Sequence, residues 1–216
     1  MAYYPNSRKD YAGYMTPFYM EPAKKDVMGY RLVDTYLKKG DIILPGTPIK
    51  TDPAGTDVAN GTKTASICKY AVVSAVAADK KLISIKGRHF FQAGDKCAIS
   101  GADTLVELTI DAVTKDSITL HAANNSIKAG DILVEVASVT EGEGQSAVTV
   151  VAAKQLPNRI VDTKAEVDDL DASVSACHEV VVLENVVHYP EEFLNRTAFP
   201  GSTLLVGDPK ILFVVQ

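Results

Sequence analysis

Residues 127–136 read IKAGDILVEV, an Ala-Gly-Asp sequence followed at once by a run of strand-forming residues, and residues 91–99, FQAGDKCAI, repeat the arrangement. Glycine accepts a positive φ, and aspartate bonds back to nearby backbone amides, so the pair favours a tight turn that leads into a strand. Aligned on Gly94 and Gly130, both copies carry apolar residues three positions before and four positions after the glycine: Phe91 and Ile127, then Ala98 and Val134. This spacing predicts successive corners of one barrel.

The Gly-Asp pair occurs twice more, at Gly40-Asp41 and at Gly207-Asp208. An aspartate that acts as a general acid or nucleophile needs a second carboxylate or a histidine within reach, and no common partner recurs beside the four pairs. A reused turn is the simpler interpretation. We therefore predict structural turns rather than chemistry at Gly40, Asp41, Gly94, Asp95, Gly130 and Asp131.

Between the turns, apolar and polar residues alternate with a period of two, which is typical of strands with one buried and one wet face. Ile118 and Leu120 alternate with polar neighbours, and Ile132, Val134 and Val136 are expected on one face with Glu135 on the other. Short strands at this spacing, separated by Gly, Asn and Asp, predict a small β-barrel domain at residues 79–139.

The flanking segments contain longer apolar runs, at residues 65–77, 147–153, 180–187 and 211–215. Such runs are typical of strands covered on both faces. We predict a mainly β protein in which residues 31–78 and 140–216 form an antiparallel barrel or sandwich body that carries the small barrel as an insert. Residues 189–195 predict one short helix, and residues 162–176 fit either helical turns or a loop.

The first thirty residues differ in composition from the rest, with all four methionines and six of the nine tyrosines. They show neither a helical nor an alternating period, which predicts an extended arm over residues 1–30. Its rings are expected to lie on the chain's own body, on a sister subunit or on another partner. The candidate contact residues are Tyr3, Tyr4, Tyr11, Tyr14, Phe18 and Tyr19.

Charge and composition argue against several classes of function. The net charge of −5 and the lack of a basic stripe do not favour nucleic-acid binding. The start of the chain lacks the apolar core of a secretory signal, and no window approaches the roughly 20 apolar residues of a membrane-spanning helix. Three widely spaced cysteines, Cys68, Cys97 and Cys177, favour reduced thiols in a cytoplasm.

None of the candidate catalytic, cofactor or metal motifs has the neighbouring structure or the spacing that its chemistry requires. Residues 142–147, GEGQSA, match a dinucleotide-binding pattern, but a strand rather than a helix should follow them, so a hairpin loop is the better interpretation. Cys177 and His178 are adjacent on a predicted strand and so point to opposite faces. His89, His121 and His188 lack the spacing of a zinc site. The acidic set Asp162, Glu166, Asp168, Asp169 and Asp171 lacks the spacing of a calcium loop and favours a solvated loop.

Two stretches carry a family resemblance: KLISIKGRHFFQAGDKCAIS at residues 81–100 and LVELTIDAVTKDSITLHAANNSIKAGDILVEVA at residues 105–137. Their order resembles the central region of bacteriophage head fibre and head decoration proteins. Residues 40–48, GDIILPGTP, are similar to the amino-terminal region of that family, so the resemblance covers about residues 40–216. The first thirty residues have no counterpart in it.

The resemblance implies a non-enzymatic virion protein of a phage or prophage, without cofactors, made in the bacterial cytoplasm and located on the capsid surface. It also implies a homotrimer whose partner is the major capsid protein, and it leaves a host surface glycan open as a further partner. The alternatives are a carbohydrate-binding or adhesin-like β module, for which Phe90 and Phe91 would have to serve as aromatic platforms, and a small-molecule-processing barrel enzyme.

Overall fold

The computed structural model describes residues 24–25, 29–57, 62–141, 148–168, 172–183, 188–195, 202–205 and 208–214. These residues form strands and a single turn of 3₁₀ helix, so the predicted mainly β class is confirmed. The chain divides into two compact units, which are described separately below. One comprises residues up to Cys68, Leu156–His188 and the residues from Phe193 onward, and the other comprises Lys69–Gln155 with Tyr189–Glu192.

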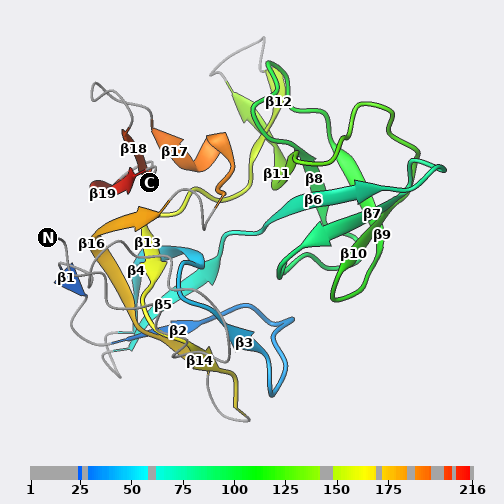
Figure 1. Cartoon of the computed structure of the whole chain (residues 1–216). Helices are drawn as coiled ribbons and strands as arrows, with labels where there is room; N and C mark the ends of the chain where they lie inside the picture. The colour runs from blue at the N-terminus through cyan, green and yellow to red at the C-terminus, as the bar shows by residue number, and fades with distance from the viewer. Residues whose placement is uncertain are drawn as a thin grey trace, which may run out of the picture. The chain divides into compact units, whose positions relative to one another are not determined.

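The unit that begins at Lys69 is built from seven strands (Figure 1). They are β6 (Tyr70–Val76), β7 (Leu82–Lys86), β8 (Lys96–Ile99), β9 (Leu108–Val113), β10 (Ser117–Leu120), β11 (Ile132–Glu141) and β12 (Val148–Ala153). Their order is β12-β11-β6-β7-β10-β9-β8, and β8 also pairs with β11. The last pairing joins six antiparallel strands, β6 to β11, into a closed ring. This unit is a small barrel. It extends beyond the predicted segment 79–139 at both ends, because β6 and β12 also belong to it.

The barrel core is made by side chains of β6 to β11 and of the segments that precede β8 and β11. Its members share almost complete burial: Ala71, Val73, Ile83, Ile85, Phe91, Cys97, Ile110, Ile118, Leu120, Ile127 and Leu133. In β10 the burial pattern alternates as predicted, with Ile118 and Leu120 inside. The apolar residues that flank the two Ala-Gly-Asp turns are buried at both copies, Phe91 with Ile127 before the turn and Ala98 with Val134 after it.

The predicted turns at Gly40, Gly94 and Gly130 share one backbone geometry. Their glycines have φ of 84°, 90° and 95°, the left-handed region that suits the third position of a type II turn. In each turn the aspartate carboxylate accepts a hydrogen bond from the backbone N–H three residues earlier, at 2.8 Å for Asp41, 2.8 Å for Asp95 and 2.7 Å for Asp131. Glycine therefore supplies the backbone conformation of the turn, and the aspartate carboxylate adds a hydrogen bond across it.

Each turn also docks on one residue of another segment by two backbone hydrogen bonds. The glycine N–H donates to that residue's carbonyl, and the same residue's N–H donates to the aspartate carbonyl. The docking residues are Val167 for the Gly40 turn, Ile110 for the Gly94 turn and Val73 for the Gly130 turn. The strands β3 (Ile42–Ile43), β8 and β11 then follow. The repeated sequence thus forms the same turn each time, and each turn begins a strand beside a defined residue of another segment.

A fourth turn with the same docking pattern was not predicted. Gly46 has φ of 87°, its N–H donates to Val161, and the Val161 N–H donates to the carbonyl of Thr47. Here Thr47 takes the aspartate position, and its hydroxyl donates to the Leu44 carbonyl at 2.7 Å. Gly207, by contrast, lies outside the described residues, and Asp208 begins a strand.

The other unit carries a ten-stranded sheet and a two-stranded one. Its strands are β1 (Lys24–Lys25), β2 (Tyr30–Leu32), β3, β4 (Pro48–Asp57), β5 (Thr62–Ile67), β13 (Arg159–Val161), β14 (Ala165–Glu166), β15 (Ser173–Val174), β16 (Ala176–Leu183), β17 (Leu194–Asn195), β18 (Ser202–Leu205) and β19 (Asp208–Val214). The order of the large sheet is β15-β2-β5-β4-β13-β16-β19-β18-β17, with β1 on β16. Most of its ladders are antiparallel, but β2 pairs with β5 and β16 pairs with β19 in parallel, which the prediction did not include.

Three local expectations are corrected. Residues 24–25 pair with β16, and Tyr30 is buried in β2, so the end of the predicted arm belongs to a sheet. The helix predicted at residues 189–195 is a single 3₁₀ turn, η1 (Glu191–Phe193). Within residues 162–176, where helical turns and a loop were both open, the described part contains the short strands β14 and β15.

The left-handed glycine gives a first prediction. A Cβ at Gly130 would have no atom within 4 Å, so Gly130→Ala introduces backbone strain and no clash. We expect it to lower the free energy of unfolding by about 1–2 kcal/mol in urea titrations. Gly130→Asn should lose less, because asparagine tolerates this conformation. Equal losses in both variants would contradict the assigned turn.

The cysteines give a second prediction. Cys68, Cys97 and Cys177 are free thiols with exposed fractions of 1%, 0% and 0%. Burial, and then the charge of Asp95, raise the pKa of the Cys97 thiol to about 12. At pH 8 we expect no reaction of the native protein with Ellman's reagent, and three thiols per chain after denaturation. Rapid labelling of Cys97 in the native protein would contradict the core described for the barrel.

Candidate functional site

A charged side chain interrupts the apolar run that was predicted as one strand at residues 65–77. The run is divided into β5 and β6, and Cys68 and Lys69 lie between the two strands. Lys69 immediately precedes β6, and its side chain is only 7% exposed. A lysine is rarely buried to this degree unless it is paired, so its surroundings identify the candidate site.

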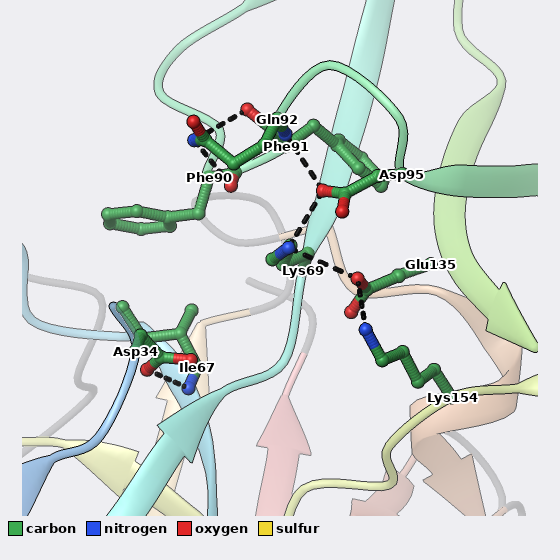
Figure 2. A network of polar contacts seen from close by, with 9 residues as sticks. All are labelled: Asp34, Ile67, Lys69, Phe90, Phe91, Gln92, Asp95, Glu135 and Lys154. Carbon is green, nitrogen blue, oxygen red and sulfur yellow. Dashed lines mark hydrogen bonds and ion pairs between the residues drawn. The ribbon is translucent and has the colours of Figure 1, made fainter. Parts of the chain in front are cut away.

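Lys69 lies between two carboxylates (Figure 2). Its Nζ is 2.7 Å from Oδ2 of Asp95 and 3.1 Å from Oε1 of Glu135. The Glu135 side chain is 5% exposed and that of Asp95 is 16% exposed. The three groups therefore meet where water is largely excluded, and charge interactions are stronger there than at the surface.

The barrel topology brings these residues together from distant positions in the sequence. β11 lies between β6 and β8, with Val134 opposite Tyr70 and Glu135 opposite Cys97. Lys69 precedes β6, Asp95 precedes β8, and Glu135 lies in β11 itself. The Glu135 N–H donates to the Lys69 carbonyl at 3.1 Å, which continues the β6–β11 ladder up to the lysine.

A second lysine balances the charge. Lys154 follows β12 directly, its Nζ lies 3.0 Å from Oε1 of Glu135, and its backbone N–H donates to the Glu135 carbonyl at 2.9 Å. The Lys154 side chain is 47% exposed, and its ammonium group meets the buried groups at Glu135. Together Lys69, Asp95, Glu135 and Lys154, hereafter the lysine cluster, contain two positive and two negative groups.

Asp95 has two functions in this arrangement. Its Oδ2 accepts the turn-closing hydrogen bond from the Gln92 N–H at 2.8 Å and also contacts the Lys69 ammonium at 2.7 Å. The matching oxygen of Asp131 closes its own turn by accepting from Lys128. The Gly94 turn therefore places a carboxylate in the lysine cluster through the geometry that it shares with the Gly130 turn.

A hollow of about 270 Å³ opens beside the lysine cluster. Asp95, Glu135 and Lys154 line it together with Val136, Ala137 and Ser138 of β11. The neighbouring Tyr70 is half-buried, and desolvation of its phenol raises its pKa above the usual value, so its hydroxyl stays protonated at neutral pH. Three members of the lysine cluster thus adjoin a hollow that is open to solvent.

Sequence reasoning recovered only part of this site. Asp95 was predicted as a turn residue, and that role is present. Glu135 was predicted on a wet strand face, and that prediction is wrong: its residue is 4% exposed because two lysines supply the counter-charges that burial requires. Lys69 and Lys154 were not singled out, although a lysine inside an apolar run was a usable signal.

The remaining sequence candidates lie elsewhere. His121 Nδ1 is 3.1 Å from Asp111 on an exposed surface, and His89 Nε2 is 2.9 Å from the Thr114 carbonyl. Burial is the main cause that lowers the pKa of His89. The Cys177 thiol donates to the Ile160 carbonyl at 3.4 Å and is buried. Asp162 is buried as well, contrary to the solvated loop predicted there.

Several candidates fall outside the part of the chain that the structure describes. These are the arm residues Tyr3, Tyr4, Tyr11, Tyr14, Phe18 and Tyr19, the acidic residues Asp169 and Asp171, and the segment 142–147. The strands on either side of that segment, β11 and β12, pair antiparallel with Glu141 opposite Val148. Among the described residues no group of three or more His, Cys, Asp and Glu side chains is arranged to hold a metal ion, and no helix could span a membrane.

No family model, no curated protein and no solved structure matches this chain.

A matched pair of variants tests the double function of Asp95. Asp131→Ala removes one turn-closing hydrogen bond, and we expect a loss of about 1 kcal/mol in the free energy of unfolding. Asp95→Ala removes the same bond and also the partner of the buried Lys69, so we expect a loss of about 3 kcal/mol. Urea titrations of both variants under one condition make the comparison, and equal losses would show that Lys69 does not depend on Asp95.

Proposed function

We propose that this chain is a non-enzymatic structural protein of a phage virion, a head fibre or capsid decoration subunit that docks on the assembled capsid. The observation that supports it most directly is that residues 81–100 and 105–137, the two stretches that resemble that family, contribute β7 to β11 to one ring of strands. These two stretches thus lie in one compact unit, whereas residues 40–48 belong to the other unit.

The chemistry of the lysine cluster is consistent with a structural role. Its carboxylates are engaged by two lysines and by the turn amide of Gln92, and its four members come from four segments of the barrel. Such contacts connect strands at one end of a barrel. A projecting virion protein has to resist shear and dilution, and a ring of strands joined at its corners suits that task.

The partners proposed are further copies of this chain, as a homotrimer, and the major capsid protein. The aromatic segment 1–23 supports the second partner, because tyrosine and phenylalanine supply large contact areas at low entropic cost. A carbohydrate-binding module is less well supported, since Phe91, one of its two candidate platforms, is 1% exposed in the barrel core.

Co-sedimentation with empty capsids of the encoding phage or prophage tests the proposal. The full-length chain should pellet with capsids, and light scattering should give the mass of three chains. A variant with Tyr3, Tyr4, Tyr11 and Tyr14 changed to Ser should bind capsids at least tenfold more weakly. A control variant with Asn6, Ser7 and Lys9 changed to Ala should bind like the wild type.

The result that contradicts the proposed function is full-length, folded protein that stays in the supernatant even with a large excess of capsids. Capture on a glycan array without capsid binding would favour the adhesin-like alternative. Equal binding by the two arm variants would overturn the role of the tyrosines but leave the proposed capsid partner intact.

A further inference from the structure

The lysine cluster brings together the groups required for a covalent reaction between side chains. A lysine amine and an aspartate carboxyl can condense to an amide when they are held in contact, and a second carboxyl group within reach of both can carry protons between them. Nζ of Lys69 lies 2.7 Å from Oδ2 of Asp95, and Oε1 of Glu135 lies 3.1 Å from the same nitrogen. Such contacts replace a bimolecular encounter by an intramolecular step.

We propose that Lys69 and Asp95 form an intramolecular isopeptide bond between Nζ and Cγ, with Glu135 as the proton carrier. The site is a self-modification site. It is independent of the proposed function, because it follows from the three side chains and their burial alone.

The steps balance without any further reactant. The Lys69 ammonium gives a proton to Glu135, which passes it to the Asp95 carboxylate, and the neutral amine attacks Cγ. The new C–N bond forms, a second proton leaves the nitrogen through Glu135, and the C–O bond breaks as that proton reaches the departing hydroxyl. One ammonium and one carboxylate thus become one neutral amide and one water molecule.

Burial favours this course. Condensation replaces an ammonium and a carboxylate by one neutral amide, which suits a site from which water is largely excluded. Lys69 and Glu135 are 7% and 5% exposed. The hollow beside Asp95 gives the released water a way out.

Lys154 accounts for the charge that remains. After condensation Lys69 and Asp95 are neutral, and Glu135 still has the Lys154 ammonium at 3.0 Å. No buried charge is then left without a partner within the lysine cluster. Before condensation the same four groups are balanced two against two, so the cluster is neutral at both ends of the reaction.

The bond would join the start of β6 to the start of β8, the two strands that flank β11. Lys69 and Asp95 are separated by 26 positions in the sequence. A covalent link between Lys69 and Asp95 would hold β6 and β8 together on either side of β11, next to the Gly94 turn.

Intact-mass spectrometry of the purified full-length protein tests the inference. We expect the wild-type chain, incubated in the folded state to completion and then denatured for the measurement, to be lighter than its uncondensed mass by one water molecule. Lys69→Arg sets the reference, since arginine does not condense. A digest should contain one branched peptide that joins residues 69 and 95, and a wild-type chain of full mass without it overturns the proposal.

Two conservative variants separate the chemistry from a purely ionic contact. Asp95→Asn should still condense but release ammonia, so its final mass should equal that of the condensed wild type. Glu135→Gln keeps the size of the side chain but cannot carry the proton, and it should retain its full mass while circular dichroism shows a folded protein. Condensation in Glu135→Gln overturns the role of Glu135, and full mass in Asp95→Asn counts against the bond.

Discussion

The ammonium group of Lys69 is nearly excluded from water, and the barrel around it is arranged to supply the opposite charges. Asp95 approaches this nitrogen from the turn before β8, at 2.7 Å, and Glu135 approaches it from within β11, at 3.1 Å. Isolated charges at this depth would cost several kcal/mol, so the three residues have to be positioned together. The pairing of β11 with both β6 and β8 is the topology that permits it.

The turns determine where these strands begin. A left-handed glycine and a carboxylate that caps the turn recur at Gly40, Gly94 and Gly130, and each turn docks on one residue by a pair of backbone hydrogen bonds. Such a turn fixes both the direction and the register of the strand that follows. In one of the three, at Gly94, the capping carboxylate also contacts Lys69, so the same turn places a counter-charge beside the buried lysine.

The local signals of the sequence predicted the turns and strands well, because they depend on residues close together in the chain. Period-two alternation located β10 and the buried positions Ile118 and Leu120, and the Gly-Asp pairs located three of the four docked turns. The fourth, at Gly46, uses threonine in place of aspartate and so escaped a search for that pair. The mainly β class followed from the same short-range patterns.

The lysine cluster could not be predicted in this way, since its members lie up to 85 positions apart, from Lys69 to Lys154, and meet only through the closed ring of strands. Alternation placed Glu135 on a wet face because the rule treats a charged side chain as exposed. Burial of that residue depends on two lysines from other segments, which no window of sequence contains. The break between β5 and β6 at Lys69 was missed for a related reason, since a single lysine barely alters an apolar average.

The central claim is that Lys69 lies inside the barrel, in contact with Asp95 and Glu135. Acetylation of the native, full-length protein with a water-soluble active ester, read residue by residue from peptide masses, tests it directly. The account predicts ready acetylation of Lys154, whose side chain is 47% exposed, and no acetylation of Lys69, whose side chain is 7% exposed, in the native protein. Equal labelling of Lys69 and Lys154 in the native protein would contradict it.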